Sequence, residues 1–177
     1  MVSLKQKLNH TMKTIILSLS ALLLSMAVSA QLKVEVKCPT INVDVLNGNV
    51  NHIIIPTSNV AQIKKNLPCF TGFQEDIKSK CGSTVFYKGQ DIYFFVSRNY
   101  IEIGPHFKGN LSVPLMGASR NSLFRLLGDP EIKQPAWDAF KTSYGILILY
   151  YNKENKVDKI QLSTQSASTI QLCDDAT

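Results

Sequence analysis

The sequence has few of the residues that usually carry catalysis or hold metal ions. It contains 3 His among 177 residues, no Cys-x-x-Cys pair and no glycine-rich phosphate loop. Structural zinc sites have cysteine and histidine ligands at short, regular spacing, and phosphate-binding loops have closely spaced glycines. These absences argue against a zinc centre and against a nucleotide-binding enzyme, and we expect neither a metal ion nor a cofactor.

Nucleophilic catalysis would need a base beside an activated hydroxyl or thiol. Beyond the N-terminal segment the only candidate bases of this kind are His52, in the asparagine-rich stretch NGNVNH, and His106, in a segment with turn residues. Both are typical of solvated loop residues. We therefore predict that the protein is not an enzyme, and keep an exported hydrolase that uses His52 or His106 as the alternative.

A strongly basic stripe is also missing. The formal net charge is +6, but the N-terminal segment contributes three lysines and no acidic residue, so the remainder carries +3. Its one adjacent basic pair is Lys64–Lys65. Dedicated nucleic-acid-binding proteins concentrate basic residues on one face, so we predict no nucleic-acid partner.

The N-terminal segment has the pattern of a secretory signal peptide. Basic residues precede an apolar run from Ile15 to Met26, and the small residues AVSA end at Ala30. We predict cleavage after Ala30 and a mature protein in the periplasm or outside the cell, without a membrane span. An uncleaved anchor is the alternative, but the run is shorter than the ~20 residues that cross a bilayer. Translation from Met12 instead of Met1 would give a more typical signal.

All four cysteines lie in the predicted exported part, where oxidation is the default. Four cysteines can form two disulfides in three different pairings. We predict Cys69 with Cys81, which closes a short loop, and Cys38 with Cys173, which ties the two ends together.

Alternating apolar and polar residues predict a series of short strands. In the first half these are residues 32–36, 41–45, 52–56, 83–89, 91–96 and 99–104. A short helix is expected between the strands at 52–56 and 83–89, capped by Ser58 or Asn59 and ending at Leu67 before Pro68. Residues 106–114 are predicted to be a linker.

The stretch MGASRNSLFRLLGDP predicts a second helix. Ser119 can cap its first amide groups, and Gly128 suits the residue that ends it. Arg120 lies early in the helix, either on solvated surface or in a contact. The core face is predicted to consist of Leu123, Leu126 and Leu127.

Three more strands follow, at residues 136–143, 145–151 and 156–163. A helix and three strands thus occur twice, so we predict an α+β fold with short helices packed on an antiparallel sheet, built from two such repeats. The predicted organisation is a signal peptide at 1–30, N-terminal strands and the first repeat at 31–109, and the second repeat at 110–177. A single irregular α+β domain is the alternative.

Three features of the second half resemble a known family: Gly117–Pro130, then Trp137 on a strand, then Tyr150–Ile160. They are similar to the SmpA/OmlA outer-membrane assembly domain and to the β-lactamase-inhibitor proteins built from two such units. The resemblance implies a helix on an antiparallel sheet that binds protein, and the Cys69–Cys81 spacing is similar to the disulfide loop within an inhibitor repeat. The chain departs from the lipid-anchored assembly proteins in having Gln31 after the small residues, where they have a cysteine.

Two strands have large apolar residues on both faces, residues 91–96 and 145–151. Helices cover one face, so the second face packs within the chain, forms a homodimer or binds a partner. We predict a non-enzymatic protein-binding module, either an inhibitor or immunity factor or an envelope-assembly accessory. The predicted partner-binding residues on this face are Tyr93, Phe95, Tyr100, Trp137 and Tyr151.

Overall fold

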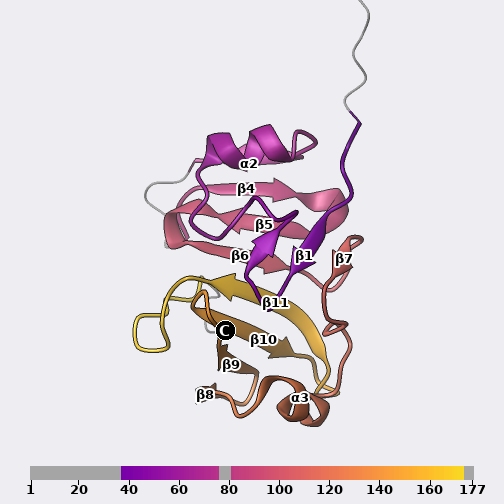
Figure 1. Ribbon diagram of the computed structural model, residues 1–177, viewed down its shortest axis with the longest axis vertical. Helices are drawn as coiled ribbons and strands as arrows, with labels where there is room; N and C mark the ends of the chain where they lie inside the picture. Colours follow the sequence, from indigo (N-terminus) through magenta and orange to yellow (C-terminus); the bar gives the residue numbers. More distant parts are fainter. Residues whose placement is uncertain (1–36, 76–80, 174–177) are drawn as a thin grey trace, which may run out of the picture. The chain divides into compact units, whose positions relative to one another are not determined.

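The structure is a computed structural model and describes residues 37–75 and 81–173. The predicted signal peptide, the cleavage site after Ala30 and the strand predicted at 32–36 lie outside these residues. The fold is α+β, as predicted (Figure 1). Within these residues the α-helices are α2 (Val60–Asn66) and α3 (Arg120–Leu127), and short 3-10 turns are found at Lys88–Gln90 and Val96–Arg98. No helix of this part is long and apolar enough to cross a membrane.

Most strands belong to one antiparallel sheet of eight, in the order β3-β4-β5-β6-β11-β10-β9-β8. The sheet thus joins strands from both halves of the chain, because β6 and β11 pair at its centre. Its strands are β3 (Gly72–Gln74), β4 (Thr84–Tyr87), β5 (Ile92–Phe95), β6 (Tyr100–Ile103), β8 (Ile132–Lys133), β9 (Trp137–Lys141), β10 (Ile146–Tyr151) and β11 (Val157–Ser163).

A second sheet of three strands has the order β2-β1-β7, with β1 (Asn42–Asp44), β2 (Asn49–Val50) and β7 (Asn110–Leu111). Strand β1 pairs antiparallel with β2 and parallel with β7, so the fold is not purely antiparallel. The prediction of a strand at 52–56 is wrong. Asn51 and His52 have positive φ angles of 51° and 60°, which turn the chain and leave only a bridge between Val50 and Ile54.

Helix α2 begins as its sequence predicts. Asn59, rather than Ser58, is the N-cap: its side chain accepts a hydrogen bond from the Gln62 amide, while the Gln62 side chain accepts one from the Asn59 amide. This reciprocal capping box satisfies two amide groups that a helix start otherwise leaves unpaired. The helix ends at Asn66, just before Leu67, and it buries Ile63.

Helix α3 differs from its prediction in two respects. Ser119 occupies the N-cap position, but its side chain makes no capping hydrogen bond; instead the Ser122 hydroxyl donates to the Ser119 carbonyl. Leu123 is buried, whereas Leu126 is 54% exposed. The buried arc of the helix runs through Leu123, Phe124 and Leu127, and at about 100° per residue Leu126 lies outside this arc, about 60° beyond Leu123.

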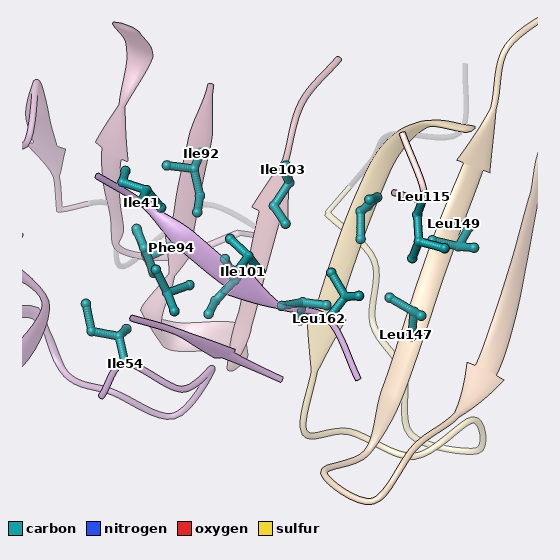
Figure 2. Close-up of a cluster of buried hydrophobic side chains, with 14 of the residues drawn as sticks. Ile41, Ile54, Ile92, Phe94, Ile101, Ile103, Leu115, Leu147, Leu149 and Leu162 are labelled. Atoms are coloured by element: carbon teal, nitrogen blue, oxygen red, sulfur yellow. The ribbon is translucent and has the colours of Figure 1, made fainter. Parts of the chain in front are cut away.

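The core lies on the sheet face that carries the helices and the smaller sheet. Figure 2 shows side chains from both halves meeting there. The strand pairing explains why the core is continuous between the two halves. On this face of the sheet, here called the inner face, one row of paired residues crosses four adjacent strands. This row consists of Phe94, Ile101, Leu162 and Leu147.

Both predicted disulfide pairs are wrong. Cys38 is bonded to Cys69, with 5.5 Å between their Cα atoms. Strand β3 lies between Cys69 and Cys81 and pairs antiparallel with β4, so Cys81 is at the other end of this strand pair from Cys69. Cys38 precedes β1 and lies beside Cys69, just after the end of α2. Cys81 lies instead beside the C-terminal segment, where its Sγ is 3.5 Å from the Cys173 carbonyl oxygen.

Candidate functional site

The face of the eight-stranded sheet opposite the core, here called the outer face, carries the candidate site. Its membership follows from the strand pairing, because residues directly opposite each other on neighbouring strands point the same way. One row crosses the sheet through Gly72, Phe86, Tyr93, Glu102, Gln161, Ile148, Ala139 and Ile132. The next row runs through Gln74, Thr84, Phe95, Tyr100, Ser163, Ile146 and Lys141.

Three half-buried aromatic side chains, Phe86, Tyr93 and Phe95, stand together on β4 and β5 and are here called the aromatic patch. They line a hollow of about 300 Å³, whose wall also includes Gln74 and Lys88. The ammonium group of Lys88 lies 5.2 Å from the centre of the Phe86 ring. The patch thus combines apolar ring surface with a cationic rim.

Tyr93 brings a polar group to the patch. Burial raises the pKa of its phenol, and the carboxylates of Asp91 and Glu102 raise that pKa further. The phenol is therefore protonated at neutral pH, with Asp91 as an acceptor beside it.

A polar network separates the aromatic patch from the second half of the outer face. The buried Gln161 side chain donates to Glu102 Oε2 at 2.7 Å and accepts a hydrogen bond from the Tyr150 hydroxyl at 3.2 Å. Lys159 Nζ lies 3.7 Å from Glu102 Oε2 and 4.0 Å from the centre of the Tyr150 ring. Two hydrogen bonds thus fix the orientation of the Gln161 side chain from both sides.

The C-terminal segment, residues 164–173, covers the second half of the outer face. Its apolar side chains pack against a small cluster on β9 and β10 that is distinct from the main core. The contacting residues of the segment are Ala167, Ile170 and Leu172, and the cluster consists of Ala139, Ile146 and Ile148. The apolar second face predicted for strand 145–151 is thus packed within the chain, whereas the aromatic patch remains partly exposed.

The five residues predicted to bind a partner have different surroundings. Tyr93 and Phe95 belong to the aromatic patch, and Trp137 is half-buried on the outer face beside Tyr150, with 6.4 Å between the ring centres. Tyr100 is on the same face but only 3% exposed, because it stacks on Phe95 at 4.4 Å.

Tyr151 lies on the opposite, inner face, so its predicted placement is wrong. Strand pairing sets Tyr150 opposite Trp137, which leaves Tyr151 on the side of the core. Its hydroxyl donates to Asp138 Oδ2 at 2.8 Å. A shift of one residue along a strand moves a side chain to the other face, and Tyr150 is the tyrosine that shares the face of Trp137.

Arg120, which the sequence placed either on solvated surface or in a contact, makes a contact within the protein. Its Nε donates to Asp138 Oδ2 at 2.9 Å, and its guanidinium group also donates to the backbone carbonyls of Gln134 and Pro135. The hydrogen bonds and charge of Asp138 raise the pKa of Arg120. Asp138 is fully buried, so Arg120 neutralises a charge that would otherwise be isolated inside the protein.

Phe86 is a member of the aromatic patch that the sequence prediction omitted. The pattern in residues 83–89 could have identified it, because Phe86 alternates with the buried Val85 and Tyr87. The hollow beside it could not be inferred, since that depends on how β3 and the segment around Cys81 border the sheet.

The two candidate catalytic histidines lie apart, and both are exposed. His52 borders a pocket of about 190 Å³ together with Asp44 and Ser112. In a catalytic triad the imidazole lies between the hydroxyl and the carboxylate; here the Ser112 hydroxyl donates directly to Asp44 Oδ1 at 3.3 Å. His106 donates its backbone amide to Asp91 Oδ2 at 2.7 Å.

Comparisons with protein-family models, with curated proteins and with solved structures gave no match. The resemblance to the assembly and inhibitor proteins thus rests on the residues quoted for it and stays a prediction. Among the residues that the structure describes, no group of three His, Cys, Asp or Glu side chains could hold a metal ion.

Proposed function

We propose that this protein is a non-enzymatic binding module that recognises another protein through the aromatic patch. The observation that carries the proposal is the position of Phe86, Tyr93 and Phe95, side by side on two strands around a hollow. Aromatic side chains offer large, stiff contact area and dominate the energetics of many interfaces. Much of the remaining outer face is covered by the C-terminal segment, which concentrates the available aromatic surface in one place.

The chemistry of the patch favours a partner segment with an apolar anchor. A side chain of the size of Leu or Phe would fit in the hollow, and polar groups around it would meet Lys88 and the Tyr93 hydroxyl. The patch stands on paired strands rather than on a loop, so little conformational entropy is lost when a partner binds.

We further propose that the module is exported to the periplasm or beyond, and acts as an inhibitor or immunity factor or as an envelope-assembly accessory. The Cys38–Cys69 disulfide supports export, because disulfides persist in oxidising compartments. The order of elements supports a tandem repeat: α2 precedes the meander β3 to β6, and α3 precedes the meander β8 to β11. Trp137 is also half-buried on the outer face, but it lies on β9 beyond the polar network and would be a separate contact.

Affinity capture with matched variants tests the proposal. The purified chain, a patch variant (Tyr93→Ser with Phe86→Ser) and a control (Leu126→Ser) are immobilised and exposed to envelope extract and culture supernatant of the source organism. Leu126 is a suitable control because it is 54% exposed on α3, away from the patch. We expect wild type and control to capture the same protein, and the patch variant to bind it at least about 10-fold more weakly.

Circular dichroism melts must show that all three proteins are folded. Equal affinity of wild type and patch variant for the captured protein would overturn the proposal. A concentration-dependent dimer in sedimentation that the patch substitutions dissociate would identify a second copy of the chain as the partner.

An exported hydrolase remains the alternative proposal, with His52 as the better-placed base. The pocket shared by His52, Ser112 and Asp44 favours it over His106. A fluorophosphonate probe should then label Ser112 in wild type and fail to label the His52→Ala variant. Absence of labelling in wild type would count against this alternative.

A further inference from the structure

The two cysteines outside the observed disulfide meet at the outer face. Cys81 precedes β4 and Cys173 lies in the C-terminal segment, 92 residues later, yet the Cys81 Sγ lies 3.5 Å from the Cys173 carbonyl oxygen. Both residues are partly exposed. The carbonyl carbon and Cβ of Cys173 are bonded to the same Cα atom, so the side chain of Cys173 starts within reach of the Cys81 sulfur.

The electrostatics of Tyr100 are consistent with this proximity. Its buried phenol is affected by both cysteines: burial chiefly raises its pKa, and Cys173 and Cys81 raise it further. Tyr100 stands on β6 and stacks on Phe95.

The C-terminal segment is held in position by further contacts. The Arg98 guanidinium donates to the Gln171 side chain, and Gln165 Nε2 donates to the Arg98 carbonyl at 3.2 Å. The Gln171 amide donates in turn to Gln165 Oε1 at 2.8 Å. These bonds and the apolar contacts of Leu172 bring Cys173 to Cys81 before any covalent bond forms.

We propose that Cys81 and Cys173 form a second disulfide, which fastens the C-terminal segment across the outer face. The oxidant is a small or protein disulfide, of which glutathione disulfide is the simplest. One cysteine thiolate attacks it to give a mixed disulfide and one reduced glutathione; the other thiolate then attacks the protein sulfur of the mixed disulfide and releases a second. The protein loses two electrons and two protons, and the glutathione disulfide gains them.

The bond would secure both parts of the outer face. Cys81 lines the hollow of the aromatic patch, so its oxidation fixes one wall of that hollow. Cys173 ends the segment whose apolar side chains cover Ile146 and Ile148, so the bond also keeps this second cluster buried. The proposal concerns the covalent state of the chain and holds whether or not the patch binds a protein.

Peptide mapping tests the pairing directly, because trypsin cleavage after lysine and arginine separates all four cysteines. The cysteine-containing peptides span residues 38–64, 66–78, 81–88 and 160–177. The full chain, purified reduced, is equilibrated with graded mixtures of reduced and oxidised glutathione, quenched by alkylation, digested and analysed by mass spectrometry without reduction. We expect a linked pair of peptides 81–88 and 160–177.

The same titration in urea gives the reference state. Folding should raise the tendency of Cys81 and Cys173 to pair by at least about tenfold over the unfolded chain, because contacts rather than chance bring them together. Alkylation of both cysteines in folded protein at glutathione ratios that fully oxidise Cys38 and Cys69 would overturn the proposal. So would linkage of peptide 81–88 to any peptide other than 160–177.

Hydrogen exchange measures the consequence for the segment. In the Cys173→Ser variant, residues 164–173 should exchange faster than in oxidised wild type, and adding reductant should abolish the difference. A Cys38→Ser variant with Cys69→Ser serves as the control, because it retains the proposed bond and should leave exchange in this segment unchanged. Equal exchange in Cys173→Ser and oxidised wild type would show that no such bond fastens the segment.

Discussion

Arg120 is the side chain that connects helix α3 to the sheet through charge. It donates to the fully buried carboxylate of Asp138 and stacks over the ring of Tyr151, with its guanidinium carbon 4.7 Å from the ring centre. A helix of 8 residues is too short to be stable alone. The contact therefore serves both to neutralise Asp138 and to hold the first turn of the helix in place.

Replacing Arg120 by alanine should strongly destabilise the protein. The variant leaves the Asp138 carboxylate buried without its cation, which costs about 3 to 5 kcal/mol in comparable cases. Arg125 on the same helix is exposed, and Arg125→Ala is the matched control, with an expected change within about 0.5 kcal/mol. Urea unfolding measures both. A small effect of Arg120→Ala would mean that water reaches Asp138.

Asp44 should make stability depend on acid pH. Hydrogen bonds from the Asn47 side chain, first, and from the Asn47 amide, Ser112 and Leu46 lower the pKa of its carboxyl below the ordinary 3.8. A lowered pKa in the folded state adds stability above the unfolded-state pKa, and this contribution is lost as pH falls through the folded-state pKa.

We therefore expect Asp44→Asn to be less stable than wild type near neutral pH, and the difference to shrink below pH 3.8. Thermal melts of both proteins at pH 7 and near pH 3 measure it. A constant gap between Asp44→Asn and wild type would contradict the assignment.

At the scale of elements, helix α3 contacts the core through only part of its surface: Leu123 is buried and Leu126 is exposed. Leu123→Ala should cost about 2 to 4 kcal/mol, because it leaves a cavity in the core. Leu126→Ala, three residues later, should change stability by less than about 0.5 kcal/mol because that side chain is exposed. Urea unfolding of the two variants compares them directly, and equal losses would show that the helix is rotated relative to the structure.

The turn between β1 and β2 depends on a glycine. Gly48 has a φ angle of +65°, and a Cβ atom there would collide with the ring of Tyr144, whose hydroxyl donates to the Val45 carbonyl at 3.1 Å. Gly48→Ala should therefore lower stability by more than about 1 kcal/mol. Gly89→Ala is the control, because its Cβ would have no atom within 4 Å. Differential scanning calorimetry would detect the change, and equal melting temperatures would contradict the steric argument.

At the scale of the whole molecule, the disulfide connects the beginning of the described chain to the end of α2. Cys38 and Cys69 are 31 residues apart, and closing a loop of that length contributes about 3 to 4 kcal/mol in the chain-entropy description. The double variant Cys38→Ala with Cys69→Ala should lose stability of this order relative to oxidised wild type in urea unfolding. A loss below about 1 kcal/mol would indicate that the unfolded chain already holds these ends close.

Local patterns in the sequence determined the parts of this protein that depend on near neighbours. Apolar alternation predicted the strands at 84–87, 92–95, 100–103, 137–141, 146–151 and 157–163. Capping residues and the glycine or proline at the helix ends predicted α2 and α3. The pattern at 41–45 also predicted β1, but the other strands of two or three residues were missed, because so short a segment has no measurable period. Strand β3 is an example: neighbouring β4, rather than its own pattern, makes it a strand.

The tertiary structure alone decided which distant residues meet. Cys69 pairs with Cys38 rather than Cys81, although Cys81 is nearer in sequence, because strand β3 carries the chain away. Alternation separated Tyr150 from Tyr151 but could not say which faced outward, since pairing with β9 sets that choice. The sequence likewise identified aromatic strands, but only the path of the C-terminal segment shows which half of the outer face stays exposed. Side-chain periodicity is a property of one strand, whereas burial is a property of everything packed against it.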